Sequence, residues 1–373
     1  MNFTISIFGD FAKFRYGKMP KKSGIKENGK YPIYSGYRYV GYCDEYNMEA
    51  NQLIIVARGV GGTGDVKLTR EKCYLTNLSI SAKIDSNVAI PQYLYYYFSI
   101  RNLRYLDSGS AQSQITISDL EKVKIPLPNL ERQKRIVHYL SLIDKKISVN
   151  ESINNNLLEQ ALTLYATQFS SLELNGCIGD YCAVKSGFAF KSSWWTNSGI
   201  RVIKIGSINQ DNLNLLECSY VDEDKADKAK DFVVKAGDLL IAMTGATIGK
   251  FAMVPYSSEM LLVNQRVGKF FLGNNPVEKL PFIYCTLKQP EVYGEVVNRG
   301  QGSAQPNISA SDIMSIPCVI PSKDAINDFN NTSQPLFDLI ISNQRENQHL
   351  SELRNALLPK LMSGELDVSN IEI

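Results

Sequence analysis

The longest regular pattern of apolar positions lies between residues 129 and 169, a stretch without glycine or proline. Apolar residues recur there at steps of four and three, the spacing of a helix that pairs with another helix. The positions that follow this spacing are Ile136, Leu140, Ile143, Ile147, Asn150, Asn154, Leu157, Ala161 and Leu164. At about 1.5 Å per residue, roughly 40 residues form a rod of about 60 Å. We therefore predict one long helix here.

The same spacing returns 193 residues further along the chain. The corresponding positions are Phe329, Ser333, Leu336, Ile340, Asn343, Asn347, Leu350, Arg354 and Leu357. Pro335 and Pro359 fall near the two ends of this second stretch. Because proline removes a helical hydrogen bond, we expect the second helix to be shorter or more kinked than the first.

Both apolar stripes are interrupted near their midpoints by the same spacing, Asn-x-x-x-Asn. Asparagine at a core position weakens a coiled coil but fixes its register. In an antiparallel pair the midpoints meet, so Asn150 and Asn154 are expected to bond Asn343 and Asn347 across the seam. The alternative is that these asparagines lie just off the stripe and face water.

Short apolar runs outside these helices predict strands. Leu53–Ala57 and Leu239–Met243 are each followed by a glycine-rich segment, which is typical of a hairpin turn. Two further runs end in Pro128 and Pro321, directly before the predicted helices. These boundaries divide the chain into residues 1–128, 129–170, 171–321 and 322–373.

The two globular segments repeat one another. Gly109-Ser110-Ala111-Gln112 and Gly302-Ser303-Ala304-Gln305 open stretches that align without a gap to the prolines before each helix. Four more pairs of similar strings, which begin at Gly9/Gly179, Leu53/Leu239, Leu75/Leu262 and Tyr93/Phe282, precede these stretches in the same order in both halves. The number of residues between the two members of a pair grows along the chain. One such pair arises by chance, but five in order indicate an internal repeat with insertions such as Asp222–Lys225. We predict an α+β chain: two mixed α/β domains separated by two long helices that pack as an antiparallel coiled coil with pseudo-two-fold symmetry.

Composition narrows the class of protein. With 373 residues, 44% hydrophobic and 21% charged, the chain is long enough for two or three globular domains. It contains no apolar run of membrane-spanning length, and Met1–Phe14 lacks the plan of a signal peptide. The seven cysteines form no Cys-x-x-Cys motif, so free thiols in a cytoplasmic protein are expected rather than disulfides or a metal site.

The net charge of +2 does not by itself indicate nucleic-acid binding. Between Asp10 and Lys30, however, seven lysines and arginines face only two acidic residues, and tyrosines follow. This combination suits a face that contacts phosphates. A solvated basic loop explains it equally well.

Two motifs suggest chemistry that their surroundings do not support. Gly59–Gly64 fits G-x-G-x-x-G, but a β-like run follows where a dinucleotide site requires a helix. Gly245–Lys250 is one residue too short for a Walker A loop and lacks its serine or threonine. The sequence also contains no methyltransferase motif, and no acidic cluster is spaced convincingly for a nuclease. A recognition protein without its own active site is consistent with these absences.

Taken in order, several strings resemble those of the specificity subunits of type I restriction-modification systems. Ile125–Ile136 resembles that family's helix entry, Gly237–Ile241 and Gly302–Gln305 its target recognition domains, and Leu353–Leu366 its closing segment. The resemblance covers nearly the whole chain. One departure is Glu131–Arg135, which has no clean counterpart after Pro321, so a docking contact there is expected to differ.

The resemblance implies a role. Each target recognition domain would read one half of a bipartite double-stranded DNA site, and the helices would set the spacer and dock two modification (methyltransferase) subunits. Catalysis and cofactors would then belong to partner subunits: S-adenosylmethionine on the modification subunits, and ATP and Mg²⁺ on the restriction (translocase/endonuclease) subunits. We expect no cofactor, metal or membrane contact for this chain.

Candidate DNA contacts are the basic, hydroxyl and amide side chains near the glycine-rich turns, the repeated Gly-Ser-Ala-Gln strings and the basic segments. They are Lys18, Lys21, Lys22, Lys26, Tyr37, Arg38, Arg58, Thr63, Ser110, Gln112 and Gln114 in the first domain, and Lys191, Lys204, Thr244, Thr247, Lys250, Arg266, Ser303, Gln305 and Asn307 in the second.

Three alternatives remain open. The chain is the specificity subunit of a related modification-only or type II-like system, a phosphate-ligand enzyme that uses the glycine loops, or a scaffold whose helices only hold proteins together. Nucleotide binding without DNA binding favours the enzyme. Failure of both domains to bind DNA with their partners present favours the scaffold.

Overall fold

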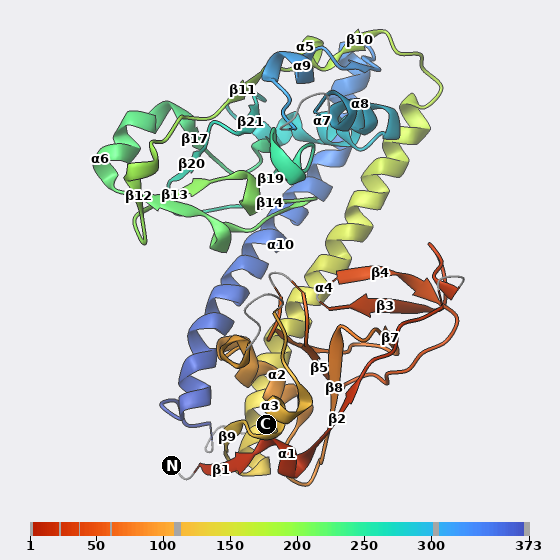
Figure 1. Cartoon of the computed structure of the whole chain (residues 1–373). Coiled ribbons are helices and arrows are strands. Elements are labelled where there is room, and N and C mark those ends of the chain that lie inside the picture. The colour runs from red at the N-terminus through yellow and green to blue at the C-terminus, as the bar shows by residue number, and fades with distance from the viewer. Residues whose placement is uncertain are drawn as a thin grey trace. The chain divides into compact units, whose positions relative to one another are not determined.

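The computed structural model describes residues 3–21, 24–36, 38–59, 62–107, 113–300 and 306–368. The chain forms two compact units. Unit 1 consists of residues 1–144 and 353–373, and unit 2 consists of residues 145–352. Each unit therefore contains one globular domain, the beginning of the long helix that follows this domain, and the end of the other long helix (Figure 1).

Unit 1 is built on a four-stranded antiparallel sheet with the order β2-β8-β5-β6. A second sheet, β4-β3-β7, combines an antiparallel and a parallel pair, and β1 pairs with β9. The elements are β1 (Thr4–Ile7), α1 (Phe8–Phe11), β2 (Ala12–Tyr16), β3 (Tyr31–Ser35), β4 (Arg38–Cys43), β5 (Leu53–Val56), β6 (Val66–Leu68), β7 (Tyr74–Leu75), β8 (Ser79–Ile84), α2 (Pro91–Ile100), η2 (Arg104–Leu106), α3 (Ile117–Glu121) and β9 (Lys124–Leu127).

The core of unit 1 joins both parts of the chain that make up this unit. Leu53, Ile55 and Ile80 of the sheet pack with Tyr93 and Leu94 of α2. Buried residues near the two helix ends complete the cluster: Ile136, Leu140, Leu358, Leu361, Met362 and Val368. Because removing apolar surface from water is the main driving force of folding, residues 353–368 are an integral part of this domain.

Unit 2 repeats this plan with additions. Its elements are β10 (Gly176–Cys177), α5 (Ile178–Tyr181), β11 (Val184–Ser186), η3 (Ser192–Trp194), β12 (Trp195–Thr196), β13 (Ile200–Ile203), η4 (Ile205–Ser207), β14 (Ile208–Asn209), β15 (Asn212–Leu213), η5 (Leu215–Glu217), β16 (Ser219–Val221), α6 (Glu223–Ala226), η6 (Asp227–Phe232), β17 (Val233–Val234), β18 (Leu239–Ala242), η7 (Gly245–Thr247), β19 (Phe251–Met253), β20 (Leu261–Val263), β21 (Val267–Phe270), η8 (Pro276–Glu278), α7 (Leu280–Leu287), α8 (Pro290–Gly300), α9 (Ala310–Met314) and β22 (Pro317–Cys318).

The two units share their sheet topology. The sheet β11-β21-β18-β19 of unit 2 has the same strand order and antiparallel pairing as β2-β8-β5-β6. Likewise β13 runs parallel to β20 as β3 runs parallel to β7, and β10 pairs with β22 as β1 pairs with β9. The internal repeat predicted from the sequence is therefore a repeat of the fold.

Two glycine positions show that the repeat extends to close backbone contacts. A Cβ on Gly17 would lie 2.4 Å from the carbonyl oxygen of Leu75, and one on Gly187 would lie 2.3 Å from that of Val263. Gly9 and Gly179 meet the backbone before β9 and β22 in the same way, at Glu121 and Met314. Gly17 and Gly187 leave no room for a Cβ beside the backbone, and the space at Gly9 and Gly179 is tighter than an ordinary Cβ contact.

The second copy differs mainly between β13 and β18. Here unit 2 adds the β14–β15 hairpin, α6 and η6, and its outer sheet has five strands in the order β12-β16-β13-β20-β17. The predicted insertion at Asp222–Lys225 lies in this region, with Asp222, Glu223 and Asp224 exposed. Most of the growth in offset between the two halves of the sequence arises before β18, from 170 at Gly9/Gly179 to 186 at Leu53/Leu239.

Both long helices are continuous. Helix α4 spans Leu130–Phe169 with 40 residues, and α10 spans Lys323–Ser363 with 41 residues. The expectation that prolines shorten the second helix is therefore wrong. Pro335 and Pro359 are exposed, as are Asn331 and Asn355, whose carbonyl groups lose their helical donor, so these carbonyls can bond water instead.

Within unit 2 the two helices run antiparallel, and asparagines join them. Asn150 Nδ2 donates to Asn347 Oδ1 at 2.8 Å, and Asn343 Nδ2 donates to Asn154 Oδ1 at 2.8 Å. Asn150 is 1% exposed and therefore lies inside the seam, whereas Asn154, Asn343 and Asn347 are half-buried. The hydrogen bonds expected from the Asn-x-x-x-Asn spacing are present.

The start of each long helix holds a buried amide that anchors its own domain. Gln133 accepts a hydrogen bond from Ile90 N at 3.0 Å, just before α2, and donates to Val88 O and Pro128 O. Asn330 accepts from Phe282 N at 2.9 Å in the first turn of α7. Nothing in the apolar pattern predicted these contacts, because each depends on a neighbour about 45 residues away.

Candidate nucleic-acid interface

The two glycine-rich segments are hairpin turns, as predicted. The first joins the antiparallel strands β5 and β6, and the second joins β18 and β19. Gly59 and Gly64 have φ of 129° and 89°, and Gly245 and Gly249 have φ of 73° and 82°. Since other residues rarely adopt positive φ, these glycines determine the shape of both turns. A strand follows each turn, which excludes the helix-based dinucleotide and Walker A sites.

In each domain, the segment that leads into a short helix lies against this turn. Ile115 N donates to Ala57 O at 2.9 Å, and the backbones of Arg58 and Gln114 form an isolated antiparallel β-bridge. In unit 2, Ile308 N donates to Met243 O at 2.9 Å, and the backbones of Thr244 and Asn307 form the corresponding antiparallel β-bridge. Two candidate contacts that are far apart in sequence are thus neighbours in both domains.

A capping box fixes this segment at the start of α3 and of α9. Asp119 N donates to Thr116 Oγ1 at 3.3 Å, and the Asp119 carboxylate accepts from Thr116 N at 2.9 Å. Ser309 and Asp312 form the same pair of bonds, at 3.1 and 3.0 Å. The Thr116 and Ser309 hydroxyls also donate to these carboxylates, at 2.6 Å, and together with the backbone donors they hold the pKa of Asp119 and of Asp312 below the usual range. The spacing Thr/Ser-x-x-Asp is a sequence signal for this motif that the repeat analysis did not use.

Most candidate DNA contacts that the structure describes are accessible. The exposed residues among them are Lys18, Lys21, Lys26, Arg38, Arg58, Lys191, Arg266 and Asn307. Half-buried ones belong to Gln114, Lys204, Thr244, Thr247 and Lys250. Lys22, Tyr37, Ser110, Gln112, Ser303 and Gln305 lie outside the described residues.

Thr63 differs from the other candidates. Its side chain is buried, at 5% exposure, and its hydroxyl donates to Gly59 O at 3.0 Å within the same turn. The side chain thus closes the turn and does not face solvent. The hydroxyl oxygens of Thr244 and Thr247 are buried as well, and they have no hydrogen-bond partner among the described residues.

Two of the candidate lysines are engaged within the protein. Lys26 forms an ion pair with Asp44. Lys204 Nζ donates to Ser219 Oγ at 3.1 Å and lies 4.3 Å from the centre of the Trp195 ring. The basic residues that sequence reasoning grouped together therefore differ in the charge that they present to solvent.

The residues predicted to pair the helices lie along the inner faces of α4 and α10. Ile136, Leu140, Asn150 and Ile340 are buried, and Ile143, Ile147, Asn154, Leu336, Asn343 and Asn347 are half-buried. In unit 2, Glu346 accepts from Asn150 Nδ2 at 2.7 Å and pairs with Lys146 at 3.0 Å. These donors lower the pKa of Glu346.

The motif Glu131–Arg135, which lacks a counterpart in the second half, holds the segment that follows α10 in unit 1. Arg132 Nη2 donates to Leu366 O at 3.3 Å, and Arg135 Nη1 donates to Val368 O at 3.4 Å. In unit 2 the segment after α4 is held differently, by two bonds between Asn175 and Ile320.

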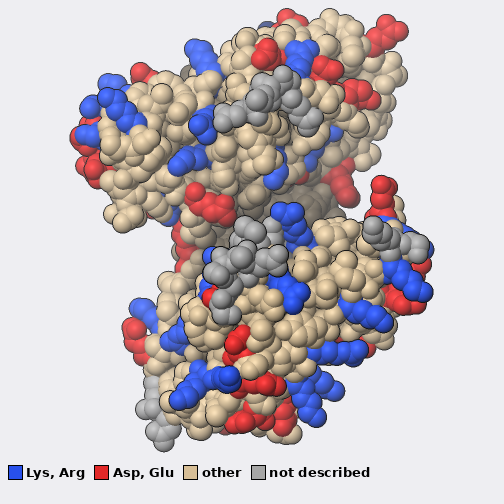
Figure 2. Space-filling model, in the orientation of Figure 1, with Lys and Arg blue, Asp and Glu red and all other residues tan. Residues whose placement is uncertain are grey.

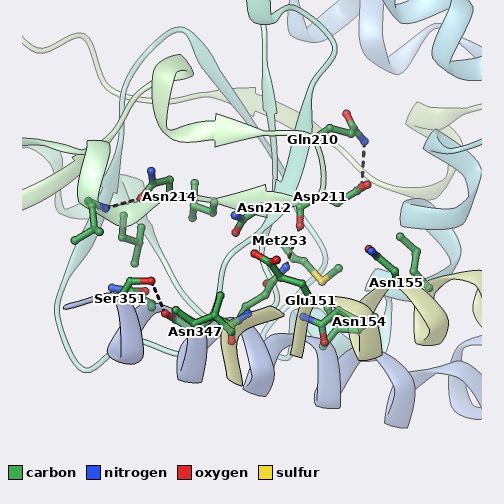
Figure 3. A pocket seen from close by; sticks show the side chains of 18 of the residues that line it. Glu151, Asn154, Asn155, Gln210, Asp211, Asn212, Asn214, Met253, Asn347 and Ser351 are labelled. Atoms are coloured by element: carbon green, nitrogen blue, oxygen red, sulfur yellow. Dashed lines mark hydrogen bonds between the residues drawn. The ribbon is translucent and has the colours of Figure 1, made fainter. Parts of the chain in front are cut away.

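Unit 2 also contains a cavity of about 350 Å³ beside the helix pair (Figure 3). Its floor is a network around Asp211, whose carboxylate accepts from Tyr284 and Lys288 and whose carbonyl accepts from Gln344 Nε2 at 2.9 Å. Its walls are rich in amides, including Asn154, Gln210 and Asn347. Among the described residues that line it there is no lysine, arginine or histidine, so this cavity does not suit a phosphate group.

Other reactive groups are sparse in the part of the chain that the structure covers. It shows no group of three or more His, Cys, Asp or Glu side chains that could hold a metal ion. All seven cysteines are free thiols, and burial raises the pKa of Cys73, Cys182 and Cys318 to about 12. None of the helices that it describes is long and apolar enough to cross a membrane.

Comparison with known proteins agrees with this architecture. The type I restriction enzyme MjaVIII specificity subunit of Methanocaldococcus jannaschii is 24% identical, with 97% of this chain and 92% of that protein covered. The MjaIX specificity subunit of the same organism is 26% identical over 79% of this chain and 74% of its own length. The crystal structure of the S subunit of a type I restriction-modification system from M. genitalium superposes with a TM-score of 0.58, at 19% identity, over 96% of both chains. The sequence pattern of one family matches twice, over residues 2–159 and 174–349, so the chain belongs to the family of type I restriction modification DNA specificity domains.

Proposed function

We propose that this chain gives a type I restriction-modification enzyme its sequence specificity by reading a bipartite DNA site, one half with each domain. The observation that carries the proposal is the pair of equivalent backbone β-bridges, Arg58 to Gln114 in the first domain and Thr244 to Asn307 in the second. The same turn and the same helix entry meet in both domains, yet they present different side chains. A backbone arrangement that is repeated with different side chains suits two half-sites of different sequence.

The side chains at this place have the chemistry of base readout. Arginine donates two parallel hydrogen bonds to guanine, and glutamine or asparagine pairs with the major-groove edge of adenine. Arg58 is exposed and Gln114 half-buried beside it, while Asn307 is exposed beside Thr244. Lys18, Lys21, Lys250 and Arg266 would contact phosphates, which position the protein without specifying sequence.

The long helices would set the spacer between the half-sites and dock two modification subunits. Their support is the hydrogen-bonded seam in unit 2, because buried polar pairs fix one register and exclude slipped ones. The modification subunits would bring S-adenosylmethionine and methylate adenine. Restriction subunits would add ATP- and Mg²⁺-dependent translocation and cleavage, and the chain itself would be non-catalytic.

Exchange of one domain tests the proposal. Replacing residues 171–321 by the second domain of another family member, in the assembled enzyme, should change one half of the methylated site and leave the other half and the spacer as they were. Sequencing of methylated adenines reads both halves at once. A change in both halves contradicts modular reading.

Two alternative functions are distinguished by measuring translocation and DNA binding. A modification-only or type II-like system gives the same methylation pattern without ATP-dependent translocation. For a scaffold, neither domain binds DNA even when the modification subunits are present.

A further inference from the structure

The inner sheet of unit 1, β2-β8-β5-β6, carries basic side chains on its strands and no acidic ones. Lys13 of β2 lies directly opposite Lys83 of β8, and Arg15 follows Lys13 by two residues. Alternate residues of a strand, and residues directly opposite each other, share one face of a sheet. Lys13, Arg15 and Lys83 therefore point to the same side, and we refer to these three residues as the basic sheet face.

The basic sheet face is open and lies on the side of the sheet away from the core. Phe14, between Lys13 and Arg15, packs on the opposite side with the core of unit 1. On β5 the outer sheet covers the face, because Ile54 clusters with Cys73. On β2 and β8 all three basic residues are exposed. Figure 2 shows lysine and arginine side chains gathered where Figure 1 labels β2 and β8.

Neighbouring carboxylates do not balance the charge of the basic sheet face. Among the described residues, no carboxylate oxygen lies within 4.0 Å of its charged nitrogens. Asp10 and Asp85 are the only acidic residues within two positions of β2 or β8, and they lie at the end away from the β5–β6 turn. Like charges directly opposite each other destabilise a strand pair, so Lys13 and Lys83 do not serve the stability of the sheet.

The whole first domain has an excess of positive charge. Residues 1–128 contain 17 lysines and arginines against 11 aspartates and glutamates, a net charge of +6. Residues 171–321 contain 14 against 15, a net charge of −1. The surroundings of the basic sheet face therefore add to its positive potential, and such a potential attracts polyanions.

The equivalent face of unit 2 is nearly neutral. Strands β11 and β21 correspond to β2 and β8, and Ala183 and Phe271 stand where the first domain has its two opposed lysines. Lys269 of β21 forms an ion pair with the buried Asp238 at 2.6 Å. Lys185, in the place of Arg15, remains as the one exposed cation of these two strands in the described chain.

Backbone pairing places the basic sheet face near the proposed base contact Arg58. Arg15 lies opposite Ser81, and Ser81 lies opposite Ile54, which precedes Arg58 by four residues. Strands are about 4.8 Å apart and rise about 3.3 Å per residue, so the Cα atoms of Arg15 and Arg58 are roughly 16 Å apart. Lys18 continues the row from β2, and its N donates to β7 at 3.0 Å. Half a turn of DNA, about 17 Å, covers this distance.

We propose that the basic sheet face binds the DNA sugar–phosphate backbone beside the half-site read by the first domain. The inference rests on the proposed function and adds a contact that the second domain lacks. Lysine and arginine recognise phosphate without reference to base sequence. The row from Lys13 to Lys18 spans roughly 17 Å along the strand direction, the length of about five base pairs.

Salt dependence of DNA binding tests this proposal. In the full chain assembled with its modification subunits, the double variant Lys13→Ala/Lys83→Ala should weaken binding to specific and scrambled duplexes by the same factor. The slope of log Kd against log salt should fall by about two units, because each phosphate contact contributes roughly 0.9. The affinity lost between about 50 and 200 mM salt should then shrink roughly tenfold. An unchanged slope overturns the contact and leaves the proposed function intact.

A matched control removes the same charge elsewhere in the first domain. Lys122 and Lys124 are exposed at the end of α3 and the start of β9, outside the inner sheet. Lys122→Ala/Lys124→Ala should leave the slope unchanged, and an equal fall would assign the effect to net charge and overturn the contact. Lys13→Arg/Lys83→Arg keeps both charges and should retain the wild-type slope. Loss of slope in this variant contradicts recognition by charge.

Uncharged phosphate analogues locate the contact on the DNA. The exchange of residues 171–321 identifies which half-site belongs to the first domain. Methylphosphonates beside this half-site should weaken binding of the wild type more than binding of Lys13→Ala/Lys83→Ala. The same replacement beside the other half-site should weaken both by the same factor. Equal losses at both places overturn the assignment to the first half-site.

Two further outcomes separate this contact from other partners and from the proposed function. Loss of the modification subunits from the double variant, measured by size-exclusion chromatography, would show that the basic sheet face binds an acidic protein surface. This result overturns the DNA contact alone. Absence of DNA binding by the wild-type assembly overturns both the contact and the proposed function.

Discussion

At the scale of single residues, amide side chains carry much of the specificity of this molecule. Gln114 and Asn307 occupy equivalent places beside the turns, Asn150 and Asn347 join the helices, and Gln133 anchors α2. A carboxamide offers both donors and an acceptor, so one side chain satisfies neighbours of either kind. The same residue type therefore serves helix register and domain anchoring and, in the proposed function, base reading, and only its surroundings distinguish these roles.

Gln114→Ala and Asn307→Ala should each reduce specific DNA binding without loss of stability. Each good bidentate base contact contributes about 1–3 kcal/mol of discrimination, so affinity for the specific site should fall roughly 5- to 150-fold while non-specific binding stays constant. Competition binding of the assembled enzyme measures both. Ser118→Ala, at an exposed site on α3, is the control. Equal loss on specific and scrambled DNA would show that the amide does not read a base.

Asn330→Ala should destabilise unit 2 much more than Asn331→Ala. Asn330 is 3% exposed and its amide bonds Phe282 N and the Tyr181 hydroxyl, whereas Asn331 is exposed on the same helix. A buried group that loses its partner costs about 1–3 kcal/mol. Urea unfolding of the two variants, followed by circular dichroism, compares neighbouring positions on one helix. Similar values for both would show that this anchor contributes nothing.

At the scale of elements, the apolar pattern predicted what depends on local spacing. The long helices, the strands before the glycine-rich turns and the seam asparagines all follow from periodicity in the sequence. It misjudged Pro335, because whether a proline interrupts a helix depends on where its freed carbonyl points, here towards water. It also missed the anchors at Gln133 and Asn330, whose partners are distant in sequence. Among the candidate DNA contacts, the sequence could not separate exposed Arg58 from buried Thr63.

The capping box at α9 should make stability depend on pH in the acid range. The pKa of Asp312 is lower in the folded chain than its usual value of 3.8, so the ionised form stabilises the fold. This contribution is complete above the unfolded pKa and is lost as pH falls through the lower folded pKa. Asp312→Asn should therefore be less stable than wild type at pH 7, with the difference shrinking only as the pH falls below 3.8 and disappearing once the pH is below the folded pKa. Thermal unfolding across this range, with exposed Asp231→Asn as control, measures the effect. A difference that persists at low pH would assign it to packing.

The asparagine seam should show direct energetic coupling. Asn150→Ala and Asn347→Ala remove two ends of one 2.8 Å hydrogen bond, so the double variant should be more stable than the sum of single effects predicts. Coupling between contacting residues is typically about 0.5–3 kcal/mol. A double-mutant cycle in urea measures it, and exposed Asn156 paired with Asn347 provides the control cycle. Coupling no larger than in the control would mean that the seam does not depend on this bond.

At the scale of the whole molecule, the boundary between the units crosses both long helices. It falls between Asp144 and Lys145 in α4 and between Glu352 and Leu353 in α10. Insertions at these two points leave the contacts inside each unit unchanged, including the Asn150–Asn347 bond of unit 2 and the Asp144–Arg354 ion pair of unit 1. The helices thus provide a place where the proposed spacer role can be changed alone.

Three heptads inserted at both points should lengthen the recognised spacer and leave the half-sites as they were. At about 1.5 Å per residue, 21 added residues extend each helix by roughly 30 Å. This length is close to one turn of DNA, so the two half-sites stay on nearly the same side of the DNA helix relative to each other. Sequencing of methylated adenines should show a spacer about nine base pairs longer. An active enzyme with the original spacer would show that the helices do not set it.

The division of the chain between the units also determines the order in which they are completed during synthesis. Unit 1 begins before unit 2 in the chain, so residues 1–144 leave the ribosome before any of unit 2, yet Leu358, Leu361, Met362 and Val368 belong to the core of unit 1. These residues are translated only after all of unit 2. The first domain to be started is therefore the last to be finished, and until then its nascent form exposes the apolar surface that α10 later covers. A nascent chain stalled between residues 145 and 352 offers chaperones and proteases a binding surface that the finished protein has buried.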